Sequence, residues 1–484
     1  MAANLRNYIN GFSEDAREII EQFEFDNQIT KLDEHNLLFI VLKRFQEVDL
    51  HTSVVSSMEM GYMFEEIIRK FAEISNETAG EHFTPREVIR LMVNLLFMND
   101  KAILTQKGIV KTIFDCCAGT GGMLSVAEEY LHELNPDARL EVFGQELNPE
   151  SYAICKSDML IKGQNPTNIA KGNSLVNNDN AKQKGDQFLN KKFDYLITNP
   201  PFGVKWEKFA KDVVQEHEEQ GHGGRFGAGL PSKSDGSFLF LMNLMSKMKS
   251  EGSKLAIVFN GSPLFSGSPS AGKNESSIRQ WIIENDMLEA IVALPNQLFY
   301  NTGISTYIWI INNRKAKERK GKVQLINAVD FYKKMSKSLG DKRNELTEEH
   351  IQTITKLYGE FAPTEACKIF DNADFGYSKV TVERPETKNG KPVLDKQGNP
   401  KADSSLRDTE NIPLKENIQD YIKREVLPHV PDAWVDEKKT NVGYEINFTK
   451  YFYQYKPLRS LAEIKADILA LENETDGLLR EVIA

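Results

Sequence analysis

Cysteine is scarce in this chain: only four occur, at positions 116, 117, 155 and 367, and they form no CxxC pair. That spacing excludes a disulfide framework and the cysteine pairs of zinc sites, so we expect a reducing compartment and no metal site. Long apolar runs are also missing. No stretch of roughly eighteen apolar residues could span a membrane, and the start of the chain lacks a signal-peptide core. We expect a soluble, cytoplasmic protein.

An excess of basic residues is missing too. The chain has 60 Lys and Arg against 70 Asp and Glu, a formal charge of −10. Phosphate should repel such a chain, which argues against tight autonomous binding to nucleic acid. Any such role needs a local patch or a partner. The densest basic segment, 314–322, has six Lys or Arg and one Glu, and we interpret it as a solvated loop between two strands.

With 484 residues, of which 40% are apolar, the chain is long enough for several domains with cores. Apolar positions at helical spacing predict helices at 14–24, 33–48 and 58–75. The segment Thr84-Pro85-Arg86-Glu87 predicts a capped helix start, with Thr84 as the N-cap and the helix ending near Leu96. We expect an N-terminal helical region at 1–78, a catalytic domain at 79–330, an accessory region at 331–455 with exposed turns near 386–412, and a C-terminal helix at 456–484.

From residue 111 onward, short apolar runs alternate with helical patterns, which is typical of a doubly wound α/β fold with a largely parallel sheet. The last two runs follow each other without a helical pattern, so at least one edge strand should be antiparallel. Ligands of such sheets bind beyond the carboxyl ends of the strands. The expected strands are 111–115, 140–145, 168–170, 193–198, 254–259, 288–294, 304–311 and 323–328.

A glycine-rich segment follows the first expected strand, where its glycines would let the backbone approach a ligand closely. A GxGxxG dinucleotide motif fails because Leu124 occupies the third glycine position, and the Gly-Lys-Ser/Thr of a P-loop is missing. The adjacent carboxylate, Asp115, suits a neutral or cationic ligand. The segment consists of Asp115, Cys116, Cys117, Ala118, Gly119, Thr120, Gly121 and Gly122.

Polar residues also end the next two expected strands. Glu146 is placed to accept hydrogen bonds from both hydroxyls of a ribose, and Asn173 and Ser174 follow the third strand. With the glycine segment they outline a nucleoside pocket without a phosphate cradle. S-adenosylmethionine fits such a pocket, which makes this molecule the expected cofactor.

The tetrapeptide Asn199-Pro200-Pro201-Phe202 ends the fourth expected strand. Pro200 and Pro201 stiffen the loop, and the residue before a proline is kept out of the helical region, so the direction of the Asn199 side chain is restricted. Its carboxamide oxygen and a backbone carbonyl can accept both N–H bonds of an amine.

Such acceptors matter because the lone pair of an aromatic amine is delocalised into the ring and is a poor nucleophile. Two acceptors draw the nitrogen toward tetrahedral geometry and stabilise the positive charge that develops during attack on a sulfonium methyl. A base within a duplex must first flip out, and Phe202 is placed to stack on it. These residues therefore predict methyl transfer to an exocyclic base amine.

At this point the chain resembles the methylation (modification) subunit of type I restriction-modification systems, an adenine-specific DNA methyltransferase. Residues 81–86, 115–122 and 199–202 resemble that family's first cofactor motif, glycine motif and catalytic motif, in the family's order. The resemblance implies a mixed seven-stranded, Rossmann-like methyltransferase sheet. Methyl transfer from S-adenosylmethionine to the N6 amine of adenine is the implied activity.

The resemblance also assigns further residues. It implies that Phe83, Thr84 and Pro85 contact the cofactor, and that Phe299 and Tyr300 help to wall the target-base pocket. Asn173 stands where the family often has an aspartate, and its oxygen can still accept from an adenine amine. The segment 221–229, with five glycines, is either a mobile lid or a flexible loop.

Partners are implied as well. In this family a separate specificity subunit recognises the DNA sequence, a restriction subunit can join, and the complex holds more than one modification chain. A capping box at Ser460 and Glu463 begins a helix that pairs either with the specificity subunit or with its own body. Its heptad positions are Leu461, Ile464, Ile468, Leu471, Thr475, Leu478 and Val482.

Other functions share some of these features. Related loops serve methyltransferases acting on cytosine amines, guanine amines in RNA or a protein glutamine amide. Phe202 in place of tryptophan, and a glycine motif upstream of the catalytic loop, favour adenine. In a different class, the chain would be a catalytically silent scaffold of a restriction complex. The intact set of Asp115, Glu146 and Asn199 argues against a scaffold.

Overall fold

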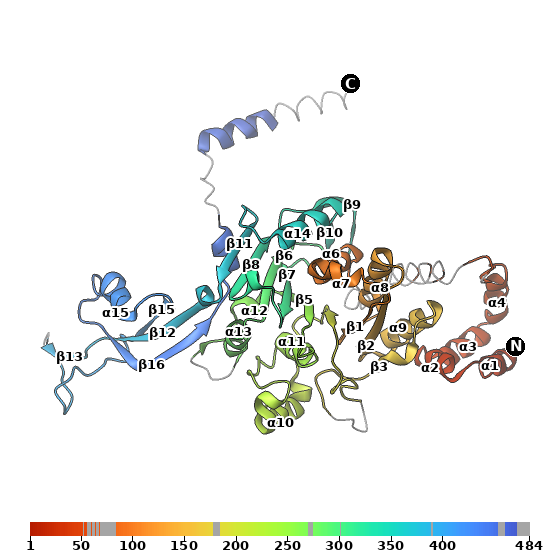
Figure 1. The fold of residues 1–484 in the computed structure, drawn as a ribbon, viewed down its shortest axis with the longest axis horizontal. Helices are drawn as coiled ribbons and strands as arrows, with labels where there is room; N and C mark the ends of the chain where they lie inside the picture. The colour runs from red at the N-terminus through yellow and green to blue at the C-terminus, as the bar shows by residue number, and fades with distance from the viewer. Residues whose placement is uncertain are drawn as a thin grey trace. The chain divides into compact units, whose positions relative to one another are not determined.

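The computed structural model describes residues 1–51, 53–55, 60, 63, 67, 84–177, 184–269, 274–300, 302–388, 391–453 and 460–471. The chain forms two units, 1–446 and 447–484. The first holds an N-terminal helical region, a large central sheet and three small sheets of two or three strands (Figure 1). The second holds α16 (Phe448–Phe452) and a helix over 461–471. Within the described part, no helix combines the length and apolarity needed to cross a membrane.

The central sheet has nine strands in the order β11-β8-β6-β7-β5-β4-β1-β2-β3. All eight expected strands are confirmed as β1 to β8. The run β3-β2-β1-β4-β5-β7-β6 contains the seven strands of the expected methyltransferase sheet, and β8 and β11 extend it. The strands are β1 (Val110–Asp115), β2 (Arg139–Glu146), β3 (Ile169–Lys171), β4 (Tyr195–Thr198), β5 (Lys254–Asn260), β6 (Leu288–Ala293), β7 (Thr306–Asn312), β8 (Lys322–Asn327) and β11 (Cys367–Asp371).

One strand runs against the others inside the sheet. β7 is antiparallel to both β5 and β6, whereas β8 is parallel to β6. The expected antiparallel edge strand is present as β11, but the run 304–311 that suggested it forms β7 inside the sheet, which is a correction. The chain returns from β6 without a helix and must therefore reverse direction. Insertion between two strands buries the apolar run 308–311 on both faces, which an edge position would leave partly exposed. The edge is taken by β11, which is antiparallel to β8.

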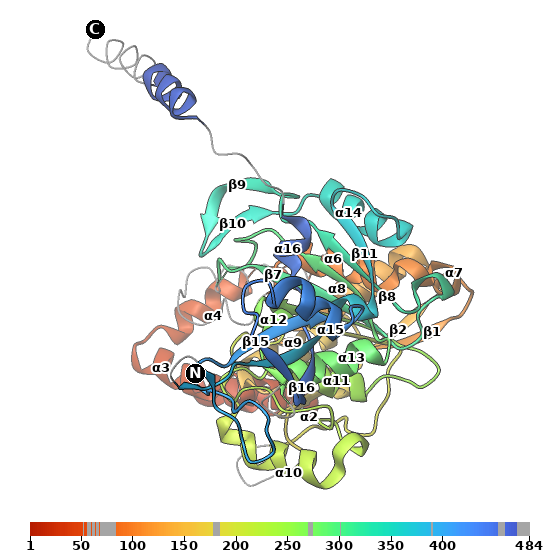
Figure 2. The same cartoon turned by 90° about the vertical axis from the view of Figure 1, so that its left-hand side faces the viewer.

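Helices cover both faces of this sheet (Figures 1 and 2). Alternate strand residues point to opposite faces. Ile310 belongs to the core cluster shared with α6, α8 and α14, while Trp309 packs edge-on against Phe238 of α11, with ring centroids 6.1 Å apart. The helices are α6 (Arg86–Phe97), α7 (Lys101–Leu104), α8 (Gly122–Leu134), α9 (Pro149–Ile161), α10 (Ala210–Gln220), α11 (Ser237–Ser246), α12 (Ser262–Phe265), α13 (Glu275–Glu284) and α14 (Glu348–Glu360).

The N-terminal helices pack beside α9. Glu18 of α2 accepts hydrogen bonds from Tyr152, at 3.0 Å, and from Lys156. The expected helix 14–24 is confirmed, and 33–48 becomes the end of one helix and the whole of the next. The expected helix 58–75 lies almost wholly outside the described residues. The helices are α1 (Ala2–Ile9), α2 (Glu14–Gln22), α3 (Phe25–Glu34) and α4 (Leu38–Gln46).

The predicted cap of α6 is wrong in its details. The helix begins at Arg86, Pro85 is the cap residue, and no side chain caps the helix. Thr84 instead accepts a hydrogen bond from Asn199, and Glu87 takes the ammonium group of Lys342. The side chains of Thr84 and Glu87, which would otherwise form a capping box, are bonded to residues distant in sequence. The helix ends at Phe97, one residue beyond the expected end.

The accessory region adds one strand to the central sheet and, within the described residues, forms three small sheets, β10-β9, β15-β12-β16 and β13-β14. β11 joins the central sheet, so that sheet continues past residue 330, where we place the end of the catalytic domain. Short exposed strands lie in the expected turn-rich segment. The elements are β9 (Lys333–Leu339), β10 (Lys342–Glu345), β12 (Gly376–Glu383), β13 (Thr387–Lys388), β14 (Lys391–Pro392), β15 (Asp408–Pro413), α15 (Ile418–Tyr421) and β16 (Trp434–Tyr444).

The C-terminal capping box is confirmed. Ser460 and Glu463 bond reciprocally, with the Glu463 N–H donating to the Ser460 hydroxyl at 3.2 Å and the Ser460 N–H donating to the Glu463 carboxylate at 2.8 Å. Leu461, Ile468 and Leu471 are exposed on the helix that follows. The later heptad positions, Thr475, Leu478 and Val482, lie outside the described residues.

Candidate functional site

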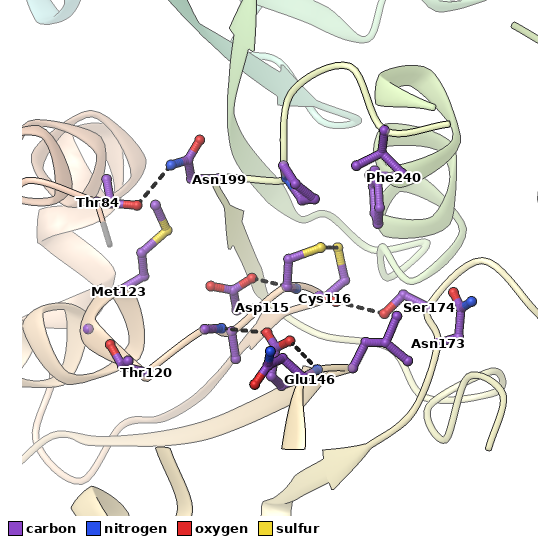
Figure 3. A pocket seen from close by; sticks show the side chains of 18 of the residues that line it. Thr84, Asp115, Cys116, Thr120, Met123, Glu146, Asn173, Ser174, Asn199 and Phe240 are labelled. Carbon is purple, nitrogen blue, oxygen red and sulfur yellow. Dashed lines mark hydrogen bonds between the residues drawn. The ribbon is translucent and has the colours of Figure 1, made fainter. Parts of the chain in front are cut away.

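A cavity of about 480 Å³ lies beyond the carboxyl ends of β1, β2 and β4, where a doubly wound sheet places its ligands. Its size suits a small-molecule or cofactor site. Eleven of the residues predicted from the sequence line it (Figure 3). They are Thr84, Asp115, Ala118, Gly119, Thr120, Gly122, Glu146, Asn173, Ser174, Asn199 and Pro201.

The glycine segment turns sharply from β1 into α8. Gly119 and Gly121 have φ of 54° and 87°, in the left-handed region that favours glycine. A Cβ on Gly121 would lie 2.8 Å from the Cys155 sulfur, so α9 leaves no room for a side chain there. Gly121 therefore shapes the loop, whereas its neighbours Thr120 and Gly122 line the cavity.

Glu146 holds this loop against the end of β2. Its Oε2 accepts the Gly119 N–H at 2.8 Å, and its Oε1 accepts the Asn148 N–H at 2.7 Å. The sequence pattern predicts that both oxygens serve ribose hydroxyls. In the structure each already has one backbone partner, but each carboxylate oxygen carries a second lone pair. Glu146 thus organises the glycine loop and still offers acceptors to a ligand.

Asp115 is a buried carboxylate at the end of β1. Burial raises its pKa to about 7, and the nearby Glu146 charge acts in the same direction. Hydrogen bonds from the Thr198 hydroxyl, at 2.7 Å, and from the Cys117 N–H, at 2.9 Å, partly oppose that rise. A cation bound in the cavity would favour the ionised form of this group.

Asn199 presents an unpaired acceptor. Its Nδ2 donates to the Thr84 hydroxyl at 2.9 Å, which holds the carboxamide in one orientation (Figure 3). Its Oδ1 is buried and has no hydrogen-bond partner among the residues that the structure describes. A buried polar atom without a partner is costly in free energy, so an unpaired acceptor on a residue that lines a cavity points to a donor on the ligand.

The two residues after β3 differ from expectation in detail. The Asn173 Oδ1 accepts the Leu175 N–H at 3.0 Å, and the buried Nδ2 lacks a partner within the described part of the chain. The predicted acceptor for an adenine amine is therefore accompanied by a free donor, which suits a ring nitrogen. The Ser174 hydroxyl donates to the Cys116 carbonyl at 2.6 Å and so ties this loop to the glycine segment.

Some predicted site residues do not line the cavity. Phe202 is half-buried against the core, and its ring meets Phe299 edge-on with centroids 6.2 Å apart. Phe299 itself is buried in the core cluster. Phe83 lies outside the described residues. The predicted residues placed away from the cavity lining are Pro85, Gly121, Pro200, Phe202, Phe299 and Tyr300.

Several lining residues were missed. Phe240 comes from the apolar face of α11 and Phe209 from the end of a short 3-10 turn, and both side chains look like core residues in the sequence. Cys116 and Cys117 lie within the recognised glycine segment, with sulfurs 3.9 Å apart, and position in that motif was the available signal. No cluster of three metal-ligating side chains exists among the described residues.

The glycine-rich segment 221–229 is anchored, although the sequence suggests a lid or a flexible loop. Arg225 is buried and donates to Glu216 at 2.7 Å, to the Asp186 carboxylate at 3.3 Å and to the Ser174 carbonyl at 2.8 Å. Lys247 reaches the same Asp186 at 2.7 Å. This buried ion network connects the segment to the loop that follows β3.

Replacing Arg225 with alanine should lower the free energy of unfolding by about 3–5 kcal/mol, because Glu216 and Asp186 would be left as incompletely paired buried charges. Urea unfolding measures the change. Lys356→Ala is the control, since Lys356 forms an exposed pair with Glu360 at 3.7 Å and should cost less than about 0.5 kcal/mol. Equal costs in the two variants would contradict a structural role for the network.

Comparison with known proteins shows the family. Residues 56–391 match the family described as N-6 DNA Methylase. The chain belongs to this family. It is 28% identical over 361 residues to the type I restriction enzyme MjaIX methylase subunit of Methanocaldococcus jannaschii, covering 74% of this chain and 58% of that protein. The N-6 DNA methylase chain described here thus spans less than two thirds of that relative's length.

Solved structures agree on the fold. A type I restriction-modification methyltransferase subunit from Streptococcus thermophilus superposes with a TM-score of 0.60 at 23% identity, covering 78% of this chain and 74% of that one. A structure described as showing complex assembly and conformational transition of the type I R-M system covers 100% of this chain and 83% of that one. Its TM-score is 0.52 at 18% identity.

Proposed function

We propose that this chain is the modification subunit of a type I restriction-modification enzyme. It transfers the methyl group of S-adenosylmethionine to the N6 amine of an adenine flipped out of DNA. The observation that carries the proposal is the unpaired, buried Oδ1 of Asn199, a residue that lines the cavity at the end of β4. Membership of the N-6 DNA methylase family and the methylase-subunit relatives support it.

The residues of the cavity fit the cofactor. S-adenosylmethionine supplies an electrophilic methyl group on a sulfonium. The free lone pairs of Glu146 suit ribose hydroxyls, and the unpaired Nδ2 of Asn173 suits a ring nitrogen of the adenine. Asp115 places a carboxylate beside a ligand of positive charge. No phosphate cradle is needed because this cofactor carries no phosphate.

The chemistry rests on hydrogen-bond acceptors. Asn199 Oδ1 and a backbone carbonyl of the loop accept both N–H bonds of the base amine, and so they localise its lone pair on nitrogen. The same acceptors stabilise the positive charge that develops there in the transition state. Thr84 keeps the amide nitrogen of Asn199 turned away from the base. No general base is required, because the methylated ammonium readily loses a proton to water.

The base reaches this site by flipping out of the duplex. Phe202 lies three residues beyond Asn199 and is half-buried, so part of its ring remains available to stack on a base, and Phe299 supports it from the side. We assign Phe299 and the next residue, Tyr300, to the wall of the target-base pocket, although neither lines the cavity described above. We assign Pro200 and Pro201 to the stiffness of this loop and Phe83, Thr84 and Pro85 to the cofactor side.

Partner subunits supply the affinity for DNA that a chain with a net charge of −10 lacks. A specificity subunit holds the DNA, a restriction subunit joins the full complex, and more than one modification chain is present. The C-terminal helix pairs with helices of the specificity subunit. Exposed apolar residues at heptad positions support this pairing, because Leu461, Ile468 and Leu471 recur on one side of the helix.

Charged residues on that side should separate the subunits. Ile468→Glu combined with Leu471→Glu is expected to abolish co-purification with the specificity subunit while leaving cofactor affinity unchanged. Ala466→Glu with Ala470→Glu is the matched control, because a rise of about 100° per residue places those positions on the opposite side of the helix. Persistent co-purification of the first pair would indicate that the helix packs elsewhere.

Cofactor affinity should depend on pH through Asp115, whose pKa is about 7 because of burial. A cationic ligand favours the carboxylate, so binding below this pKa releases a proton. Affinity therefore rises with pH, by at most about tenfold per pH unit, and levels off above the pKa. Titration calorimetry across this range measures the effect. Asp115→Asn should flatten the profile, and Asp137→Asn, at an exposed position, should preserve it.

One experiment tests the proposed function directly. The chain is incubated with DNA and isotopically labelled S-adenosylmethionine, with and without the co-encoded specificity subunit, and the labelled nucleoside is identified. Label in N6-methyldeoxyadenosine of the DNA is the expected result. Label in cytosine, RNA or protein would show that the chain is an amine methyltransferase of another substrate class. Cofactor binding without any methyl transfer would indicate that the chain is a catalytically silent scaffold.

A further inference from the structure

The β9–β10 hairpin carries a local excess of positive charge. Within 333–345 there are five Lys or Arg and two acidic residues, on a chain whose net charge is −10. Lys333, Lys334 and Lys337 are exposed on β9, as is Arg343 on β10. Lys333 approaches Glu345 at 3.7 Å. No acidic partner for Lys334 or Lys337 is found among the described residues.

One face of β9 carries exposed lysine and serine side chains. Alternate residues of a strand share a face, so Lys334, Ser336 and Ser338 project together, and all three are exposed. Lysine ammonium groups and serine hydroxyls are the side chains that contact phosphate oxygens and position proteins on nucleic acid. Lysine and serine are depleted from protein–protein interfaces, so this face suits a phosphate backbone better than a protein partner.

The hairpin is fixed to the loop that precedes β7. The Asp341 N–H donates to the Tyr300 carbonyl at 2.8 Å, and the Arg343 N–H donates to the Gln297 carbonyl at 2.9 Å. The Asn344 side chain adds a bond to the Asn296 carbonyl at 2.9 Å. This loop carries Phe299, and the Phe299 ring meets Phe202 of the catalytic loop.

A buried lysine provides a second attachment. Lys342 donates to the Leu298 carbonyl at 3.1 Å, to the Asn344 carbonyl at 2.8 Å and to the carboxylate of Glu87. Glu87 lies in the first turn of α6, three residues after Thr84, which orients Asn199. The hairpin is therefore held rigidly to both sides of the amine-acceptor site, and Figure 2 shows it at the periphery of the fold.

Sheet topology places the hairpin at the edge of the central sheet where β4 ends and Asn199 follows. β8 is parallel to β6 and therefore ends at the same edge as β4, where Asn199 lies. The hairpin follows β8 at this edge. The other basic segment, 314–322, connects β7 to β8 and lies at the opposite edge, because β7 is antiparallel. The two basic segments thus lie at opposite edges of the sheet, and only the hairpin lies at the edge that holds Asn199.

We propose that the β9–β10 hairpin is a DNA-backbone clamp in which Lys334, Ser336 and Ser338 on one face of β9, and the exposed Lys337 on its other face, hold phosphates that flank the flipped nucleotide. The clamp rests on the proposed function, since it assumes that the target base lies in DNA. It accounts for how a chain of acidic net charge keeps the strand next to Asn199 while a partner carries the rest of the duplex. The contact is independent of base sequence.

Lys334→Ala with Lys337→Ala tests the clamp in the full chain bound to its specificity subunit. Binding to a fluorescent mixed-sequence duplex is measured over a range of salt concentrations. Each lost phosphate contact lowers the magnitude of the salt slope by about 0.9, so two should lower it by about 1.8 and weaken binding roughly 60-fold near 0.1 M salt. The KM for DNA should rise, with kcat at saturating DNA unchanged.

Lys317→Ala with Lys320→Ala is the matched control, since it removes the same charge from exposed lysines at the opposite edge of the sheet. A salt slope and affinity equal to those of this control would overturn the clamp. So would dissociation of the specificity subunit from the hairpin variant, which would make the hairpin a protein interface. DNA binding is measured apart from methyl transfer. An assembly that binds DNA through the hairpin yet methylates none would contradict the proposed function and not the clamp.

Discussion

Asn199→Ala is expected to lower kcat for methyl transfer by at least about 10²–10³-fold, the range seen when one preorganised electrostatic contact to a transition state is removed. The alanine lacks the Oδ1 acceptor, which is buried and unpaired in the folded chain. Affinity for S-adenosylmethionine should change little, because Glu146 and the glycine loop lie on the other side of the cavity (Figure 3). Single-turnover kinetics and calorimetry separate the two quantities.

A second variant tests whether the hydrogen bond to Thr84 sets the orientation of the Asn199 carboxamide. Thr84→Val removes the hydroxyl that accepts the Asn199 Nδ2–H bond and keeps the shape of the side chain. The carboxamide can then rotate, so a loss of kcat smaller than that of Asn199→Ala is expected. Asn10→Ala makes the same chemical change as Asn199→Ala at an exposed position and should leave turnover intact. Unchanged turnover in Asn199→Ala would rule out the mechanism.

Removal of Glu146 should have the second-largest effect, on cofactor binding. Glu146→Ala deletes the acceptor for the Gly119 and Asn148 N–H groups, and with it the ribose contacts that we propose for this carboxylate. Hydrogen bonds to charged groups contribute about 1.5–3 kcal/mol each. A loss of about 2–4 kcal/mol of binding free energy, or roughly 30- to 700-fold in Kd, is expected because part of the cost falls on loop order.

Glu146→Gln separates charge from shape. The glutamine keeps the size of the side chain but turns an NH₂ group toward the N–H of Gly119 or of Asn148, so one backbone bond must be lost. Its Kd should lie between those of the wild type and Glu146→Ala. Glu150→Gln, an exposed change four residues away, is the matched control. Thermal unfolding of each variant shows that it is folded, and wild-type affinity in folded Glu146→Gln would refute this role.

Local pattern was enough to place the strands and the chemistry-bearing segments. Strands β1 to β8 have short apolar runs bounded by turn residues, which favour buried strands. The loops after β1 and β4 contain glycine and proline, whose backbone preferences act within a few residues. The order of these segments, together with parallel pairing, requires Asp115, Glu146 and Asn199 to meet at one edge. These features depend on neighbours close in sequence, and this is why the chain alone predicts them.

The tertiary structure decided which polar atoms of the site have hydrogen-bond partners within the protein and which do not. Thr84 reads as a helix cap but instead binds Asn199, 115 residues away. The oxygens of Glu146 are shared with the backbone, and the glycine-rich segment 221–229 is tied down through Arg225. β7 lies inside the sheet because only there are both of its apolar faces covered. Such choices depend on partners that are distant in sequence, and no local preference specifies them. The sequence alone therefore predicts Asn199, at the end of β4, as the acceptor for a base amine, and the fold determines that its oxygen is the atom left unpaired.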